Sequence, residues 1–243
     1  MTNNTIIIIP ARLSSTRLPN KPILDISGKS MIVRVWESAI AAEIGPVLVA
    51  AGDSEIFENI KKVGGNCILT DPNLPSGTDR IAAALKKFDV KKKYNKVINL
   101  QGDMPYFPSS YLKIVSNLIN NVGTDMATLA SPINKSDISN PNSVKVEIKF
   151  DDILEQNRAV NFSRFLLNDS NKKYFHHIGI YAFDRKALEN FVEYPQSSRE
   201  KSEKLEQLRA IEMNLKISID IVDKTPDSID TLEDLKLLRK KYN

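Results

Sequence analysis

Short apolar runs alternate with longer amphipathic stretches through the first half of the chain. The first run holds four consecutive isoleucines, Ile6 to Ile9, which is typical of a buried strand. Runs of this kind predict strands over 5–9, 46–51, 66–70 and 96–100. Apolar residues at helical spacing predict intervening helices over 29–42, 54–63, 79–88 and 108–120. This order predicts a mainly parallel, doubly wound α/β sheet with helices on both faces.

The middle of the chain breaks this rhythm. Strand-like segments follow one another without long helices at 125–133, 143–150 and 178–183, before a predicted helix at 185–192. We therefore expect an antiparallel subdomain over 125–195, embedded in a single domain that spans 1–243. The end of the chain returns to α/β order, with a helix at 203–214, a strand at 217–222 and a helix at 231–242.

Composition narrows the class of protein. The chain has 243 residues, of which 42% are hydrophobic and 26% charged, as in globular proteins with a sizeable core. The net charge is +4, without a basic stripe interleaved with aromatic residues, so we expect no nucleic-acid partner. Cys67 is the only cysteine, which excludes a disulfide framework. No signal-type or membrane-spanning segment stands out, so we expect a cytoplasmic protein without membrane insertion.

A cationic loop follows the first predicted strand. Residues 10–22 carry Arg12, Arg17 and Lys21 between prolines, at the strand end where open α/β sheets bind ligands. The segment has no glycine and therefore no Walker motif, so side chains as well as backbone amides would grip a ligand. A solvated surface loop is the alternative. The prolines beside the cations favour a site for a multiply charged anion such as a nucleoside triphosphate.

Two aspartates are candidates for binding a metal. Asp103 follows Gln101 and Gly102 at the end of the fourth predicted strand, where a carboxylate suits Mg²⁺ held jointly with substrate phosphates. A turn aspartate is the alternative, and it is the commoner one for an isolated Gly-Asp pair. Asp230 is the second candidate. Because Thr231 and Asp234 resemble a helix capping box, a capping role for Asp230 is equally consistent with the sequence.

Two further segments have less specific patterns. The turn at 76–80 precedes a helix, where it could receive a base or phosphate, or simply cap the helix through Thr78 or Asp79. His176 and His177 are adjacent, so in a strand they would point to opposite faces and could not share one metal. One of them fits an ordinary packed or surface histidine, and the other fits a pocket wall.

Together these segments closely resemble the 3-deoxy-manno-octulosonate (Kdo) cytidylyltransferases, also called CMP-Kdo synthetases. The matching motifs run in family order over nearly the whole chain. They are PARLSSTRLPNKP at 10–22, LPSGTDR at 74–80, QGD at 101–103, NPNSVKV at 140–146, FSR at 162–164, HIGIY at 177–181, KLEQLR at 204–209 and IDT at 229–231. The first loop is typical of sugar cytidylyltransferases, and the later motifs favour the Kdo enzymes over those for sialic acid.

The resemblance implies an activity and an architecture. CTP and Kdo would yield CMP-Kdo and pyrophosphate with Mg²⁺ as cofactor, for lipopolysaccharide synthesis. The fold would be a Rossmann-like nucleotidyltransferase, and the protein would be a homodimer. The embedded antiparallel subdomain would serve dimerisation and sugar binding, with the middle strands forming much of the interface.

The resemblance also implies roles for individual residues. The residues that would hold CTP are Ala11, Arg12, Ser15, Arg17, Lys21, Ser76 and Arg80. Those that would surround the sugar acid are Gln101, Arg164, His177, Tyr181, Glu206 and Gln207. Asp103 and Asp230 would ligate Mg²⁺, and with Arg12 and Lys21 they form the implied catalytic set.

Three positions depart from the pattern of the family. Met104 stands in place of a frequent glutamate, Asn161 in place of a tyrosine, and 199–202 in place of a Pro-Leu-Glu stretch. These departures leave the nucleotide chemistry intact, and they leave open 8-amino-Kdo or another acidic sugar as the acceptor. A non-catalytic nucleotide-binding protein on the same fold is the alternative from a different functional class.

Overall fold

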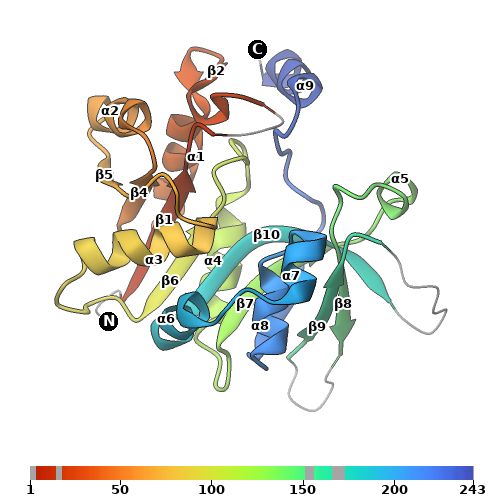
Figure 1. The fold of residues 1–243 in the computed structure, drawn as a ribbon. Helices are drawn as coiled ribbons and strands as arrows, with labels where there is room; N and C mark the ends of the chain where they lie inside the picture. The colour runs from red at the N-terminus through yellow and green to blue at the C-terminus, as the bar shows by residue number, and fades with distance from the viewer. Residues whose placement is uncertain (1–3, 15–17, 151–155, 166–172, 243) are drawn as a thin grey trace. The chain divides into compact units, whose positions relative to one another are not determined.

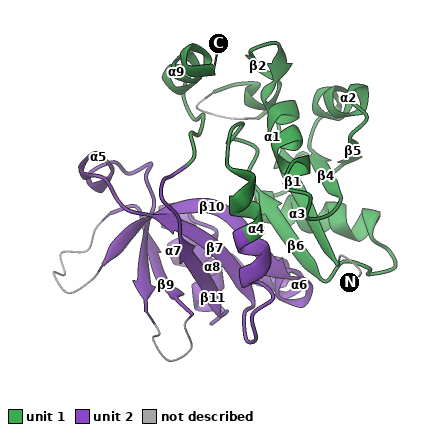
Figure 2. Ribbon diagram, turned by 180° about the vertical axis from the view of Figure 1, so that it is seen from behind, with its two compact units in different colours: residues 1–113, 226–243 green, residues 114–225 purple. Residues whose placement is uncertain are grey.

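The structure is a computed structural model that describes residues 4–14, 18–150, 156–165 and 173–242. It divides into two compact units, one formed by 1–113 with 226–243 and the other by 114–225 (Figure 2). The sequence-based boundaries of the embedded subdomain, 125–195, stay a prediction. Among the described residues, no helix combines the length and the apolar character needed to cross a membrane.

The first unit is built on four parallel strands. In the order β5-β4-β1-β6 these are β5 (Asn66–Leu69), β4 (Val47–Ala51), β1 (Thr5–Ala11) and β6 (Lys96–Leu100). Ile7 of β1 lies opposite Val47 on one side and Ile98 on the other. Every residue of β1 is buried, as the isoleucine run predicts, because helices cover a parallel sheet on both faces.

Three helices connect these strands and a fourth closes the unit. They are α1 (Met31–Ile40), α2 (Ser54–Lys62), α3 (Gly77–Phe88) and the C-terminal α9 (Leu232–Tyr242). Helices α1 and α3 lie on opposite faces of the four strands (Figures 1 and 2). Right-handed crossovers require this, because the chain moves outward from β1 and then returns to β6 on its other side.

The helix predicted over 29–42 starts later than the apolar spacing suggests. Residues Lys29–Ser30 form β3, which pairs with β2 (Asp25–Ile26) in a small hairpin. Ser27 and Gly28 both take positive φ, of 52° and 83°, which suits a two-residue hairpin turn. The helix begins after this hairpin. A single 3-10 turn, η1 (Lys21–Ile23), precedes the hairpin.

The second unit has a mixed set of strands in the order β10-β7-β11-β9-β8, with β10 also paired to β8. They are β7 (Met126–Ser131), β8 (Lys145–Lys149), β9 (Arg158–Ser163), β10 (Tyr174–Asp184) and β11 (Ile217–Ile221). Strands β7 and β11 are parallel, whereas the other pairings in this unit are antiparallel. The sequence reading missed β9, and it started β10 at residue 178.

Short helices complete the second unit, together with α4 (Ser109–Leu118), which the unit boundary divides. The others are α5 (Lys135–Ile138), α6 (Arg185–Glu193), α7 (Ser198–Glu203) and α8 (Gln207–Glu212). The single helix predicted over 203–214 is wrong. Lys204 takes a positive φ of 53°, which ends α7, and the chain turns before α8 begins.

Candidate active site

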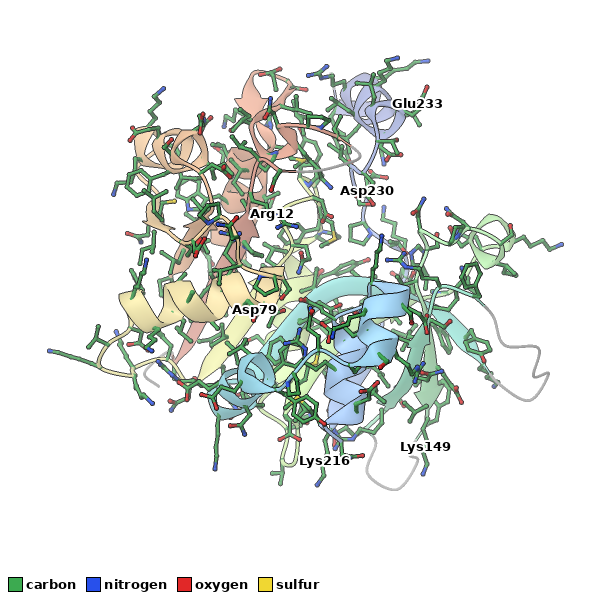
Figure 3. All side chains as sticks on the ribbon, viewed as in Figure 1. Arg12, Asp79, Lys149, Lys216, Asp230 and Glu233 are labelled. Carbon is green, nitrogen blue, oxygen red and sulfur yellow. The ribbon has the colours of Figure 1, made fainter. Side chains whose placement is uncertain are left out.

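A cavity of about 360 Å³ opens at the carboxyl ends of β1 and β6 in the first unit. Because the two strands pair in parallel, the residues that follow each of them meet at one edge. Gly102 permits this approach, since a Cβ there would lie 3.2 Å from the carbonyl oxygen of Pro10. The polar residues on the wall include Arg12, Lys21, Gln101, Asp103 and Asp230. Figure 3 labels Arg12 after β1, and Asp230 on the segment that leads to α9.

One lysine contacts both candidate carboxylates. Lys21 Nζ lies 3.4 Å from Asp103 Oδ2 and 3.1 Å from Asp230 Oδ1. The lysine side chain is 12% exposed, and the two aspartates are 34% and 30% exposed. The fold therefore brings two acids from distant parts of the sequence to a single positive charge, at an edge that solvent and ligands can reach.

This donor set fits a hard divalent cation that the protein shares with a substrate. Within the described residues, no cluster of three or more histidine, cysteine, aspartate or glutamate side chains could hold a metal alone. Magnesium typically takes only one or two protein carboxylates and keeps water or phosphate oxygens as its other ligands. Asp103 and Asp230 can supply those two carboxylates, since both already face one cationic group.

The capping box beside Asp230 is made by its neighbours. Asp234 Oδ2 accepts hydrogen bonds from the backbone N–H groups of Asp230 and Thr231, and Thr231 Oγ1 accepts from Asp234 N. Burial raises the pKa of Asp234, but these hydrogen bonds outweigh it and hold the pKa below its usual value. The side chain of Asp230 contacts Lys21 instead.

A second cavity of about 240 Å³ is lined by Arg12, Gln101 and the start of α3. Ser76 caps α3 by accepting from Asp79 N at 3.2 Å, so the turn does cap the helix, but through Ser76 and not through Thr78 or Asp79 as predicted. Ser76 nevertheless lines the cavity, as does Arg80. The two interpretations of the segment are therefore compatible.

The Arg80 guanidinium is almost fully buried and holds a neighbouring loop. It donates to Thr70 Oγ1 at 2.6 Å and to the carbonyl oxygens of Asp71 and Pro72. Burial and the nearby charge of Arg12 lower the pKa of Arg80 from its usual value. Arg80 thus forms a fixed, positively charged part of the wall. Ser15 and Arg17, the other predicted nucleotide ligands, lie outside the described residues.

The second unit holds a buried cluster around His177. Its Nε2 lies 3.0 Å from Thr128 Oγ1, and its ring lies 4.9 Å from that of Phe162 and 5.5 Å from that of Tyr181. Burial, with a smaller effect of His176, lowers the pKa of His177 to about 3, so the imidazole is neutral near pH 7. The neighbouring His176 has a different partner, because adjacent side chains of a strand point to opposite faces. Its Nδ1 lies 3.4 Å from Asp137 Oδ2.

Arg164 is already engaged by backbone carbonyls. Its Nε donates to Glu203 O at 2.6 Å, Nη1 to Pro141 O at 2.8 Å and Nη2 to Lys204 O at 3.2 Å. These bonds fix the turn that leads into α8, where the predicted sugar ligands Glu206 and Gln207 lie. The guanidinium carries five N–H groups, so it can hold the turn and still donate to a ligand.

Comparison with known proteins identifies the family. A family model described as cytidylyltransferase matches residues 6–217. The chain belongs to this cytidylyltransferase family. The resemblance that the motifs indicated is therefore confirmed.

Individual relatives are similar over almost their whole length. The 3-deoxy-manno-octulosonate cytidylyltransferase of Paramagnetospirillum magneticum is 40% identical over 235 residues, which cover 96% of each chain. That of Rhodospirillum rubrum is 42% identical over 236 residues, covering 96% of this chain and 94% of the relative. A solved structure of CMP:2-keto-3-deoxy-manno-octonic acid synthetase complexed with CTP has a TM-score of 0.88 and 33% identity, covering 98% of each chain.

The sequence reading of this cytidylyltransferase missed Asp53. Its Oδ2 accepts a hydrogen bond of 2.7 Å from Leu13 N and so pins the cationic loop from the end of β4. Gly52 N donates to Ala11 O beside it, at 2.8 Å. The signal was present, because Gly52 and Asp53 follow a strand just as Gly102 and Asp103 do. A Cβ on Gly52 would lie 2.8 Å from Arg80 Nη1, so this turn also requires close approach.

Two of the three departures from the family pattern contact each other. Arg199 Nη2 donates to Asn161 Oδ1 at 3.0 Å, joining α7 to β9. Arg199 also lies 3.7 Å from Glu203, whose carboxylate accepts from Arg164 N. The third departure, Met104, is a buried apolar residue. Asn161 and Arg199 therefore form a connected group with Glu203 beside the backbone that Arg164 holds.

Proposed function

We propose that this cytidylyltransferase transfers CMP from CTP to the anomeric hydroxyl of Kdo, giving CMP-Kdo and pyrophosphate for lipopolysaccharide synthesis. The observation that carries the proposal is Lys21 between Asp103 and Asp230, on the wall of a cavity at the end of a parallel sheet. The similarity to Kdo cytidylyltransferases over nearly the whole chain supports the choice of both substrates.

The nucleotide would lie along the two cavities of the first unit. Arg12 and Lys21 would contact the triphosphate, together with Ala11 and with Ser15 and Arg17 of the same loop. Ser76 and Arg80 would help to place the nucleoside beside the start of α3. Cationic donors stabilise the charge that develops on a departing pyrophosphate, and we assign this role to Arg12 and Lys21.

Asp103 and Asp230 would hold Mg²⁺ with the help of triphosphate oxygens and water. When bound, the ion neutralises phosphate charge and makes an adjoining hydroxyl more acidic. The anomeric hydroxyl would attack the α-phosphorus in line with the departing pyrophosphate. We assign no protein side chain as the general base.

The residues that would recognise the acceptor are those that the resemblance implies, namely Gln101, Arg164, His177, Tyr181, Glu206 and Gln207. A neutral His177 can donate or accept a hydrogen bond but adds no charge, so Arg164 is the cation that suits the sugar carboxylate. We further propose a homodimer in which the strands of the embedded subdomain serve both dimerisation and sugar binding.

Pyrophosphate release tests the proposal. The protein is assayed with Mg²⁺ and each of CTP, UTP, ATP and GTP, against Kdo, 8-amino-Kdo and sialic acid. We expect release with CTP and Kdo. Preference for 8-amino-Kdo would favour a changed acceptor site around the Asn161 and Arg199 contact. CTP binding without release of pyrophosphate in the presence of any of the acceptors would favour a non-catalytic protein.

A further inference from the structure

The two segments that carry Asp103 and Asp230 are joined directly by backbone contacts. Ile229 N, from the residue before Asp230, donates to the carbonyl oxygen of Asp103 at 2.9 Å. A few residues away, Tyr106 and Asp227 form an isolated antiparallel bridge. The relative position of the two carboxylates therefore depends on this short paired segment.

The last turn of α9 contacts both residues of that bridge. The Tyr242 ring stacks on the Tyr106 ring, with centroids 3.9 Å apart and planes 19° from parallel. The Tyr242 hydroxyl donates to Asp227 Oδ2 at 3.2 Å, and Lys241 Nζ pairs with the same oxygen. Tyr242 thus contacts both residues of the bridge, one on each of the two paired segments. We call Tyr106, Asp227, Lys241 and Tyr242 the terminal clasp.

Helix α9 presents these residues from a fixed position. Its Leu235 and Leu238 are buried in one apolar cluster with Ile229, Leu18, Ile26 and Met31. Arg239 donates from Nε and Nη2 to the carbonyl oxygen of Asp25 in β2. The helix is therefore anchored by its own core contacts in addition to the terminal clasp.

Tyr106 of the terminal clasp packs against this apolar cluster, whereas the ion pair of the clasp lies at the surface. Lys241 and Asp227 are 55% and 41% exposed, so solvent weakens the ion pair between them. None of its four members is among the described residues that line the cavity of about 360 Å³. What the contacts do fix is the geometry of the two paired segments that carry Asp103 and Asp230.

We propose that Tyr242 is a positioning residue that, through Asp227 and Tyr106, sets the separation of Asp103 and Asp230 for the cation that they share. This inference rests on the proposed function, because it requires the two aspartates to bind a divalent cation. The end of the chain thereby tunes metal affinity without touching metal or substrate. Partners that hydrogen-bond directly to metal ligands change metal affinity about 10- to 100-fold when they are removed, so for contacts one step further out we expect an effect at the lower end of that range.

The test is Mn²⁺ binding to the full-length protein with CTP present and acceptor absent, measured from the free-ion signal in electron paramagnetic resonance. We expect Tyr242→Ala to weaken Mn²⁺ binding about 10-fold. The melting temperature should change little, and excess Mg²⁺ should restore most turnover. Tyr242→Phe keeps the stack and should lose less. Tyr194→Ala removes a similarly exposed tyrosine, from the end of α6, and should leave Mn²⁺ affinity unchanged.

Unchanged Mn²⁺ affinity in folded Tyr242→Ala would overturn the terminal clasp as a positioning device. If that variant does not fold, Asp227→Asn replaces it, because it removes the charge that Lys241 and Tyr242 share. Unchanged affinity in Asp227→Asn would overturn the inference equally. Asp103→Asn separates the two hypotheses. If Asp103→Asn leaves Mn²⁺ binding intact, the proposed metal site itself fails, whereas loss in Asp103→Asn without loss in Tyr242→Ala refutes only the clasp.

Discussion

The cavity edge of the first unit and the buried cluster around His177 in the second use charge in opposite ways. At the cavity edge, Asp103, Asp230 and Lys21 stay partly exposed and contact one another through side chains. In the second unit, His177 is buried and neutral, and Arg164 is held by carbonyl oxygens. A site that must exchange cations and release pyrophosphate needs charges that can change partners. A site that selects the shape of a neutral ring and one carboxylate gains from groups that are fixed.

The comparison predicts the largest functional loss from the exposed charges. Asp103→Asn should reduce Mg²⁺-dependent turnover by about 1,000-fold or more, because the cation loses one of two protein ligands. The fold should persist, since Asp103 is partly exposed. Pyrophosphate release and thermal melting measure the two effects. Asp25→Asn, at an exposed position in the same unit, is the control, and near-normal turnover of Asp103→Asn would remove this aspartate from the mechanism.

Removing a buried charge of the second unit should instead lower the stability of the fold. Glu200 accepts from Arg209 Nε at 2.9 Å and pairs with Nη2, and Arg209 also lies over the Phe191 ring. Glu200→Ala leaves a buried guanidinium without its counter-ion and should lower the free energy of unfolding by about 3–5 kcal/mol. Urea unfolding measures this loss, with exposed Glu193→Ala as the control. Equal stability of the two variants would contradict the contrast between the units.

Lys21 should show the next largest effect. Lys21→Ala should reduce kcat/KM for CTP about 10- to 100-fold, as expected when a charged hydrogen bond is removed. In the protein without nucleotide the same change removes the ammonium that faces Asp103 and Asp230, so Mn²⁺ should bind more tightly. Steady-state kinetics and a Mn²⁺ titration measure the two effects. Unchanged CTP kinetics would argue against Lys21 as a triphosphate ligand.

The last prediction concerns pH and the buried histidine. Because burial lowers the pKa of His177 to about 3, the unfolded chain binds a proton that the folded chain excludes between that pH and about 6.5. Stability should therefore fall as pH decreases through this window, by up to about 1.4 kcal/mol per pH unit. Urea unfolding between pH 7 and pH 4 measures the slope. His177→Gln should flatten it, and an unchanged slope would show that another group is responsible.

Much of the first unit was predictable because its signals are local. A run such as Ile6 to Ile9 is buried on both faces, and glycine followed by aspartate marked the turn at Asp103. The same dipeptide at Asp53 was overlooked, although it carried the same signal. The resemblance to a known family supplied the pairing of Asp103 with Asp230, which no local pattern contains.

The second unit was harder to predict because its determinants are not local. Strand β9 contains Arg158 and Asn161, whose polar side chains hide the alternation, and its pairing with β8 depends on residues far along the chain. Lys204 takes a positive φ without being glycine, so no sequence signal separated α7 from α8. Likewise, the hydrogen bonds that Arg164 donates to the carbonyl oxygens of Pro141 and Glu203 form only when three segments far apart in the sequence come together.

The most direct test of the account is a crystal structure of the protein with CTP and Mn²⁺, using the anomalous signal of manganese to locate the ion. We predict a manganese peak within coordination distance of carboxylate oxygens of both Asp103 and Asp230 and of a triphosphate oxygen, with Lys21 Nζ moved onto the phosphates. A peak that contacts neither aspartate, with Lys21 still between them and CTP bound elsewhere, would contradict it.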